Sequence, residues 1–190
     1  DVYKRQAMQA DMAPLAGAPH KISAEFVFPY LAHAPMEPLN CTVKLDGDKA
    51  ELWMGTQMPG LDAMAAAKTL GLQPQNVKVH TQMAGGGFGR RAIPTSDYVV
   101  EACGVAKAAH TAGITAPVRT LWSREDDIKG GYYRPMHVHR AEIGFDAKGK
   151  ILAWDHTIVG QSITKGSPFE AFMIKNLSLI HISEPTRLRR

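Results

Sequence analysis

The chain has 190 residues, with 22 Lys and Arg against 18 Asp and Glu and only two cysteines. This length suffices for one domain with a real core, whereas two cysteines exclude a disulfide framework and an iron–sulfur cluster held by this chain, which needs four ligands. The formal charge of +4 does not indicate a nucleic-acid surface, because residues 7–176 alone carry 17 basic and 16 acidic residues.

The two ends of the chain carry the mark of an inserted sequence. Residues 1–6 read DVYKRQ, for which GAT GTG TAT AAG AGA CAG is one permitted coding. The reverse complement of that coding translates as LSLIHI, the sequence of residues 177–182. We therefore interpret residues 1–6 and 177–190 as artefacts of a sequencing adapter and exclude them from the fold. Residues 7–176 are then expected to be a fragment of a longer protein; the alternative is a natural terminus at each end.

Alternating and helical spacing of apolar residues predicts strands and helices in turn. Three residues set limits: Pro29 interrupts the first strand, Pro59 marks the first turn of a helix, and Gly71 ends that helix. The expected elements, in chain order, are a strand over 25–31, a hairpin of 41–45 and 50–54, a helix from 59, a strand over 76–83, a helix from 94–96 to 113, a strand over 118–122, and a hairpin of 141–145 and 151–158. This order favours the α+β class, as a two-layer α/β sandwich with a mixed sheet.

The most unusual stretch is GGGFGRR, residues 85–91, which joins an expected strand to an expected helix. At such a junction backbone N–H groups are free, and glycines allow an anionic or oxygen-rich ligand to approach them closely. A dinucleotide-binding GxGxxG that starts at Gly85 fails because residue 90 is arginine, and no P-loop string GxxxxGK[ST] occurs. A tight turn between a closely packed strand and helix is the structural alternative.

Four segments share their order and spacing with one protein family. They are LAHAPMEPLNCTV from Leu31, LWMGTQMPG from Leu52, GGGFGRR from Gly85, and RTLWSREDDIKGGYYRPMHVHRAEIGFDAKGKILAW from Arg119. Together they make the chain resemble the molybdopterin-binding large subunit of the xanthine dehydrogenase and aldehyde oxidase family, in particular the branch of the isoquinoline 1-oxidoreductase beta subunit.

The resemblance implies an oxidoreductase. Its cofactor is molybdopterin with molybdenum, in the cytosine dinucleotide form, and its substrate is an aldehyde or an N-heteroaromatic compound, hydroxylated with oxygen from water. Its partner is a small [2Fe–2S] subunit that accepts the electrons, and no nucleic acid is expected. The catalytic glutamate of the family lies beyond residue 176, so the fragment alone is expected to be inactive.

The resemblance also implies roles for individual residues. Gln57 matches the family glutamine that reaches the oxo ligand of molybdenum, and the loop amides face the oxygen ligands of the metal. The expected cofactor-binding residues are Gln57, Gly86, Gly87, Phe88, Gly89 and Arg90. Glu37 is a candidate on the substrate side, with His33 as a potential hydrogen-bond partner.

Several of these residues have alternatives. Phe88 is expected either to shape the substrate cavity or to pack in the core. Arg90 and Arg91 suit pairing with a carboxylate or with the phosphate of the pterin, or else form a solvated or intersubunit pair. The xanthine dehydrogenase branch has a carboxylate after the loop, whereas residues 90–92 are Arg, Arg and Ala here, which disfavours a hydroxypurine substrate.

The remaining candidates are weaker. Cys41 and Cys103 are expected to be small core residues. His137 and His139 share a strand face and would form half of a metal site, but no further ligand is evident, so no metal ligands are assigned. Residues 123–135 are interpreted as a surface loop. Two other functions stay open: a standalone anion- or nucleotide-binding module that uses the glycine loop without redox chemistry, and one half of a split subunit.

Overall fold

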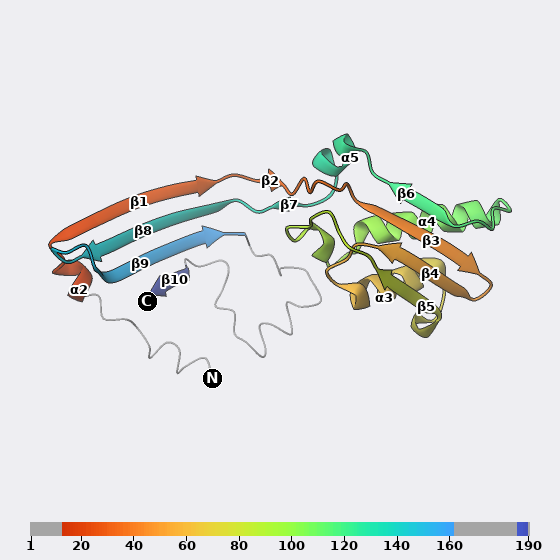
Figure 1. The fold of residues 1–190 in the computed structure, drawn as a ribbon, viewed down its shortest axis with the longest axis horizontal. Helices are drawn as coiled ribbons and strands as arrows, with labels where there is room; N and C mark the ends of the chain where they lie inside the picture. The colour runs from red at the N-terminus through yellow and green to blue at the C-terminus, as the bar shows by residue number, and fades with distance from the viewer. Residues whose placement is uncertain (1–12, 162–185, 190) are drawn as a thin grey trace. The chain divides into compact units, whose positions relative to one another are not determined.

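The computed structural model describes residues 13–161 and 186–189. It divides the chain into two compact units (Figure 1). The inner unit comprises residues 32–134, and the outer unit comprises the described residues on either side of that stretch.

The inner unit is built on a mixed four-stranded sheet of order β5-β4-β3-β6. Its strands are β3 (Asn40–Asp46), β4 (Lys49–Met54), β5 (Val77–Thr81) and β6 (Val118–Leu121). β3 pairs antiparallel with β4 and with β6, whereas β4 and β5 are parallel. Helix α3 (Pro59–Leu70) connects the parallel strands, helix α4 (Asp97–Thr111) lies between β5 and β6 in the chain, and both pack against the sheet. The hairpin, the helices and the other strands expected for this stretch are confirmed, as are the α+β class and the mixed sheet.

The core of the inner unit lies between this sheet and the two helices. Strand β4 buries every second residue, and β3 buries Cys41 and Val43 in the same alternation, because alternate side chains of a strand point to the same face. The core residues are Leu39, Cys41, Val43, Ala50, Leu52, Met54, Ala66, Ala67, Leu70, Val77, Tyr98, Val99, Ala102, Cys103 and Ala106. Burial raises the pKa of both thiols to about 12, so the two cysteines are protonated core residues, as expected.

The ends of helix α3 follow the sequence signals. Pro59 occupies the first turn. Gly71 ends the helix in the left-handed region with φ +76, and its N–H donates to the carbonyl oxygen of Ala67 at 2.9 Å. The proline and glycine at the two ends therefore fix the length of this helix.

We expect Gly71→Ala to lower the free energy of unfolding by about 1 kcal/mol, because a Cβ disfavours left-handed backbone. A steric clash does not contribute to this loss of stability, since nothing lies within 4 Å of an added Cβ. Gly60→Ala is the matched control: its added Cβ is equally free, but its φ is not positive, and alanine inside a helix is expected to stabilise it. Urea unfolding of both variants measures the difference, and equal effects would contradict the role given to φ.

Several short elements lie within the inner unit or, like β2, at its boundary. Helix α5 (Arg124–Lys129) begins after Ser123, whose Oγ accepts a hydrogen bond from the N–H of Asp126 at 3.1 Å. The interpretation of residues 123–135 as a surface loop is therefore wrong in part, since α5 is helical and Asp127 is buried. The other short elements are the 3₁₀ turns η1 (Pro74–Asn76) and η2 (Arg90–Ala92) and the paired strands β2 (Leu31–Ala32) and β7 (Tyr133–Arg134).

The outer unit is an antiparallel sheet of order β1-β8-β9-β10. Its strands are β1 (His20–Phe28), β8 (His137–Phe145), β9 (Ile151–Gly160) and β10 (Thr186–Arg189). β8 and β9 form the second expected hairpin, and β1 ends just before Pro29. The short helix α2 (Ala13–Ala16) packs on β8 and β9, where Gly144 leaves room: an added Cβ would lie 2.7 Å from the Cβ of Ala18. Strand β10 falls within residues 177–190, whose assignment to an adapter stays a prediction.

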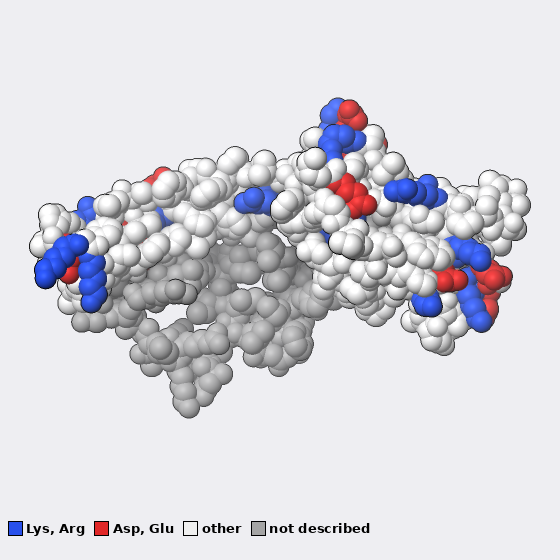
Figure 2. All heavy atoms as spheres, in the orientation of Figure 1, with Lys and Arg blue, Asp and Glu red and all other residues white. Residues whose placement is uncertain are grey.

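The apolar character of the helices and the distribution of surface charge are relevant to function. None of the helices among the described residues combines the length and the apolar character needed to cross a membrane. On the face drawn in Figure 2, basic and acidic side chains lie among one another and much of the surface carries neither. The expectation that no nucleic acid binds stays a prediction.

Candidate functional site

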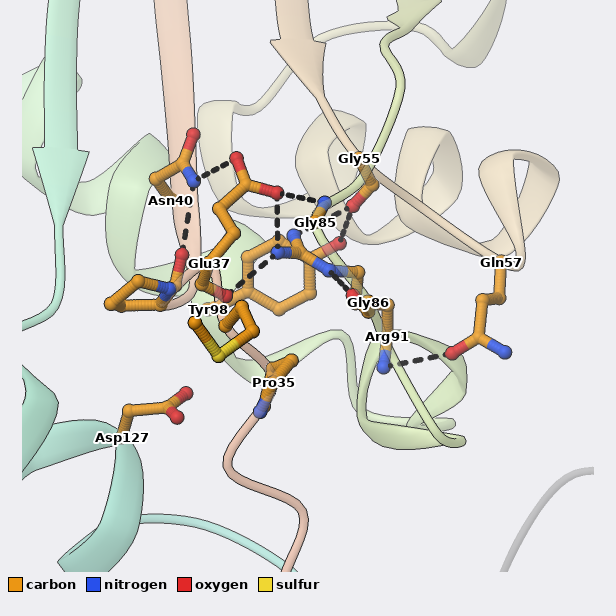
Figure 3. Close-up of polar contacts among 12 residues, drawn as sticks. Pro35, Glu37, Asn40, Gly55, Gln57, Gly85, Gly86, Arg91, Tyr98 and Asp127 are labelled. Atoms are coloured by element: carbon orange, nitrogen blue, oxygen red, sulfur yellow. Dashed lines mark hydrogen bonds and ion pairs between the residues drawn. The ribbon is translucent and has the colours of Figure 1, made fainter.

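Three segments that are far apart in the sequence meet at one end of the inner sheet. β4 and β5 run parallel and both finish there, whereas β3 is antiparallel to β4 and therefore begins there. The segment before β3 (35–39), the turn after β4 (55–58) and the glycine loop after β5 (82–92) are thereby brought together. Hydrogen bonds among these segments make them one site (Figure 3).

Two glycines of the loop are approached closely by the chain's own side chains. A Cβ added to Gly85 would lie 2.6 Å from the Cβ of Glu37. A Cβ added to Gly87 would lie 2.9 Å from the Oε1 of Gln57. Close packing against these two side chains therefore accounts for both glycines.

Three residues of the loop have left-handed backbone. Gly86 and Gly89 have φ +102 and +99, and Phe88 between them has φ +55. A bulky residue in this region is rare and is typical of sites where the surrounding contacts fix the backbone. The Phe88 side chain is 74% exposed, so the alternative of core packing is wrong, and its role beside a substrate stays a prediction.

The loop presents a run of backbone donors. From Gly86 to Gly89, no N–H donates a hydrogen bond to any described residue. The flanking amides are used: the N–H of Gly85 donates to the Oε2 of Glu37 at 2.7 Å, and that of Arg90 to the carbonyl oxygen of Gly87 at 2.9 Å. Consecutive amides of this kind form a site for negatively charged oxygen.

Arg91 lies at the centre of the site (Figure 3), and its side chain is fully buried. Its Nε donates to the carbonyl oxygen of Gly86 at 3.0 Å, and its Nη1 to that of Gly55 at 3.1 Å. Its Nη2 donates to the carbonyl oxygen of Glu37 at 3.3 Å and to the Oε2 of the same residue at 3.0 Å. One guanidinium group therefore ties the glycine loop to both other segments.

Glu37 is the carboxylate partner of Arg91. Besides Gly85 and Arg91 at its Oε2, it accepts a hydrogen bond at Oε1 from the Nδ2 of Asn40 at 2.9 Å. Partial burial acts to raise the pKa of Glu37, but the hydrogen bonds from Gly85 and Asn40 and the charge of Arg91 outweigh it and hold the pKa below its ordinary value. Glu37 is therefore ionised, and both its oxygens are engaged within the site.

Gln57 is exposed and held by the backbone of Arg91. Its N–H donates to the carbonyl oxygen of Arg91 at 3.2 Å, and its Oε1 accepts from the N–H of Arg91 at 3.2 Å. Within the described part of the chain its Nε2 donates no hydrogen bond. A free amide donor thus lies beside the run of free loop amides.

Arg90, expected among the cofactor-binding residues and suited to a carboxylate or to the phosphate of the pterin, is 1% exposed and pairs within the chain. Its Nη1 and Nη2 donate to the two carboxylate oxygens of Asp97 at 2.9 and 2.6 Å. Its guanidinium carbon lies 5.4 Å from the ring centroid of Trp122 and 5.9 Å from that of Tyr132. The solvated alternative for both arginines is wrong because both are buried, and the carboxylate pairing is found for both. The geometry disfavours phosphate binding by the Arg90 side chain.

His33 does not pair with Glu37. Its Nδ1 is buried and has no hydrogen-bond partner among the described residues. Burial lowers the pKa of His33, which keeps its ring neutral. The partners of Glu37 come instead from the glycine loop and from β3.

A buried carboxylate that the sequence did not indicate lies next to the site. Asp62, in the first turn of α3, is 2% exposed and accepts hydrogen bonds from the Oγ1 of Thr56 and, at 2.6 Å, from the Oγ of Ser96. Burial raises the pKa of Asp62, and the two hydroxyl groups offset this only in part. Asp62 thus joins the residue before Gln57 to the start of α4. An acid in the first turn also reads as an ordinary helix signal, which is why the sequence did not single it out.

We expect the stability of the wild type relative to Asp62→Asn to fall as pH rises from about 4 to 7. Because the folded-state pKa of Asp62 is raised, its favourable contribution is complete below the unfolded-state pKa of about 3.9 and is lost as pH rises through the folded-state pKa. Asparagine retains a hydrogen-bonding side chain but does not titrate. Urea unfolding across this range measures the difference, with exposed Asp48→Asn as control, and a difference that does not vary with pH would contradict the assignment.

The outer unit brings three histidines together. His137 and His139 share one face of β8, as expected, with ring centroids 6.1 Å apart. His156 of β9 joins them, its Nε2 lying 3.1 Å from the Nδ1 of His139. Within residues 13–161 and 186–189, no group of three or more His, Cys, Asp or Glu side chains is arranged to hold a metal ion.

Similarity to curated proteins points to one kind of subunit. The isoquinoline 1-oxidoreductase subunit beta of Brevundimonas diminuta is 37% identical over 131 residues, which are 68% of this chain and 16% of that protein. The aldehyde oxidoreductase molybdenum-binding subunit PaoC of Escherichia coli (strain K12) is 30% identical over 169 residues, 89% of this chain and 22% of that protein. The chain therefore spans less than a quarter of the length of these relatives.

Solved structures share the fold. Quinoline 2-oxidoreductase from Pseudomonas putida 86 aligns with a TM-score of 0.59 at 22% identity, over 78% of this chain and 19% of that chain. CO dehydrogenase from Oligotropha carboxidovorans aligns with a TM-score of 0.56 at 23% identity, over 77% of this chain and 18% of that chain. Residues 2–181 match the family described as molybdopterin cofactor-binding domain. Because this match covers nearly the whole chain and the relatives agree with it, the chain belongs to the molybdopterin-binding family of xanthine dehydrogenases and aldehyde oxidases.

Proposed function

We propose that this chain is part of the large subunit of a molybdenum hydroxylase and that its glycine loop contributes to binding the molybdopterin cofactor. The observation that carries the proposal is the run of N–H groups from Gly86 to Gly89, which donate to no described residue, beside the Nε2 of Gln57, which donates to none either. Fixed donors of this kind stabilise negatively charged oxygen in a site. Membership of the family supports molybdopterin as the group that carries this oxygen.

The residues at the site fit a group rich in negatively charged oxygen. The Glu37 carboxylate does not oppose such a group, because Gly85, Asn40 and Arg91 already engage both its oxygens. The contacts of Arg91 fix the loop in place, so binding would not require the loop to rearrange. Phe88, exposed between the free amides, is proposed to lie on the substrate side.

The chemistry and the positioning are divided between cofactor and protein. When bound, the cofactor supplies hydroxylation of an electron-poor carbon with oxygen from water. The loop amides and the Gln57 Nε2 would orient the cofactor by hydrogen bonds to its oxygen atoms. The catalytic base and the further cofactor contacts are proposed to lie outside residues 7–176, and the cofactor is proposed to be the cytosine dinucleotide form.

The substrate and the partner subunit form part of the proposal. The two relatives are named for an isoquinoline and for aldehydes, which supports an N-heteroaromatic or aldehyde substrate. Residues 90–92 are Arg, Arg and Ala, so none of them offers a carboxylate for a hydroxypurine. Electrons are proposed to leave through a small [2Fe–2S] subunit, since the chain has only two cysteines and a cluster needs four ligands. In the complete domain, the inner sheet with α3 and α4 is proposed to form a two-layer α/β sandwich.

The test uses the complete reading frame that contains residues 7–176. We expect the parent DNA to continue past the codon for Asn176 and to encode a glutamate in a second glycine-rich loop. The complete protein, expressed with the enzymes that mature the cofactor, is expected to contain molybdenum and pterin and to oxidise aldehydes or N-heterocycles with an artificial electron acceptor. A stop codon close after Asn176, with phosphate binding and no molybdenum, would instead favour a standalone anion-binding module.

In that protein we expect Gln57→Leu to lower turnover about tenfold, the effect of losing one hydrogen bond to a charged group. The unfolding midpoint should change little, because the Gln57 side chain is exposed. Gln75→Leu, at an exposed position of η1, is the matched control and should leave turnover unchanged. Equal turnover in both variants would count against a role for Gln57 at the cofactor.

A further inference from the structure

We infer that Glu37 and Arg91 are positioning residues, which together hold the donor run Gly86–Gly89 and the Gln57 amide in one fixed arrangement. In this reading Glu37 acts through the loop and does not contact the substrate, contrary to its expected place on the substrate side. The inference rests on the proposed function only for the identity of what the loop binds.

The first step is that the pair fixes the loop at several points. Gly85 directly precedes the donor run and forms two hydrogen bonds with Glu37. Its N–H donates to Oε2 at 2.7 Å, and its carbonyl oxygen accepts from the Glu37 N–H at 3.1 Å. The carbonyl oxygen of Gly86 accepts from the Nε of Arg91 at 3.0 Å. Arg91 lies shortly after the donor run, so the free amides lie between Gly85 and Arg91, both of which are held by hydrogen bonds.

The second step is that Arg91 also holds Gln57 in place. Two hydrogen bonds of 3.2 Å join Gln57 to the backbone of Arg91, one to its N–H and one to its carbonyl oxygen. The Nη1 of Arg91 also holds Gly55, two residues before Gln57, at 3.1 Å. A shift of Arg91 would therefore displace the side-chain donor and the loop donors together.

The third step is that burial and hydrogen bonds constrain the pair itself. The Arg91 side chain is fully buried, and a buried cation that loses its carboxylate cannot turn to solvent. Both Glu37 oxygens already accept hydrogen bonds within the chain, Oε1 from Asn40 and Oε2 from Gly85 and Arg91, so most of the acceptor capacity of this carboxylate serves the site itself. Neither Glu37 nor Arg91 belongs to the apolar core, so what the pair determines directly is the geometry of the site.

The first experiment needs no cofactor. In the 190-residue chain, Glu37→Asp keeps the charge but is too short to reach both Gly85 and Arg91. Hydrogen exchange in a peptide spanning residues 85–91 is expected to quicken about tenfold, because the bonded amides there open more often. Exchange in α4 should stay as in the wild type. Glu125→Asp, at an exposed position of α5, is the matched control and should change neither region.

The second experiment uses the complete protein with its cofactor. Glu37→Asp and Glu37→Gln are compared with Glu125→Asp and Glu125→Gln for molybdenum per chain, kcat per bound molybdenum and KM. We expect kcat per molybdenum to fall about tenfold or more in both Glu37 variants with KM nearly unchanged, because small displacements of positioned donors are costly. The Asp variant should keep a near-wild-type unfolding midpoint, so the comparison remains possible even if the Gln variant fails to fold.

The outcomes separate the possibilities. Normal kcat per molybdenum in Glu37→Asp, or normal exchange over residues 85–91, would overturn the inference and leave Glu37 as an ordinary structural residue. A raised KM with unchanged kcat would also overturn it, because it would place Glu37 against the substrate. A wild-type protein that binds no molybdenum would refute the proposed function, while the exchange result would still decide whether the pair fixes the loop.

Discussion

Replacing Asp97 with alanine is expected to lower the free energy of unfolding by about 3–5 kcal/mol, among the larger effects of a single substitution. Asp97 is the only carboxylate among the described residues that pairs with Arg90, whose side chain is 2% exposed. Without it, the guanidinium would keep its charge in a buried setting between Trp122 and Tyr132. The cost comes from leaving a buried charge without its counterion, and the Arg90 Nε already lacks a partner among the described residues.

A double-mutant cycle gives this prediction its control. Arg90→Met removes the buried charge at similar volume, so the double variant Arg90→Met with Asp97→Ala is expected to be more stable than Asp97→Ala alone. Exposed Glu125→Ala should change the free energy of unfolding by no more than about 0.5 kcal/mol. Urea unfolding followed by tryptophan fluorescence suits the measurement, since Trp122 lies against Arg90. A double variant that is no more stable than the single one would contradict the explanation.

The Asp97 experiment also decides what Arg90 does. If Arg90 existed to bind phosphate, removal of Asp97 would free it, and phosphate would then stabilise Asp97→Ala more than the wild type. A buried ion pair predicts no such selective effect, because the Arg90 side chain is buried and its guanidinium carbon lies 5.4 and 5.9 Å from the ring centroids of Trp122 and Tyr132. Unfolding with and without phosphate separates the two roles.

The regular elements could be predicted because their signals are local. The alternation of β3 and β4 and the proline and glycine of α3 each depend on residues a few positions apart, and the structure confirms them. The position of the glycine loop after a strand was also predictable. The division into two units was not, because antiparallel strands alternate in the same way in either unit.

The partners within the site could not be read from the sequence, because they depend on long-range contacts. Glu37 meets Gly85 across 48 positions and Arg91 across 54. Nothing local distinguishes an arginine that binds phosphate from one that will be buried against Asp97. The expected His33–Glu37 pair shows the same limit: closeness in sequence suggested a contact, but the ends of three strands place Glu37 against the glycine loop instead.

Gly85→Ala is expected to lower the free energy of unfolding by about 2 kcal/mol or more, as overpacking does in a tight contact. The added Cβ would lie 2.6 Å from the Cβ of Glu37 and 3.3 Å from its backbone N. Neither atom is at the end of a flexible side chain, so the loop or the segment before β3 must move. Faster exchange over residues 85–91 should accompany the loss of stability.

Gly87→Ala is the matched control, because the three atoms nearest to its added Cβ all belong to side chains: the Oε1 and Cδ of exposed Gln57, and an Arg91 carbon at 3.8 Å. Displacing that exposed side chain breaks its 3.2 Å hydrogen bond from the N–H of Arg91 but moves no backbone, so the free energy of unfolding should fall by about 1 kcal/mol, less than for Gly85→Ala. The displaced amide would nevertheless leave the donor run, and the complete protein should then lose turnover as Gln57→Leu does. Equal destabilisation by the two substitutions would mean that both glycines serve only packing. A Gly87→Ala variant that folds stably but has lower turnover would show that the two glycines have different roles. Gly85 would then be needed for packing against Glu37, and Gly87 for keeping Gln57 in place beside the ligand.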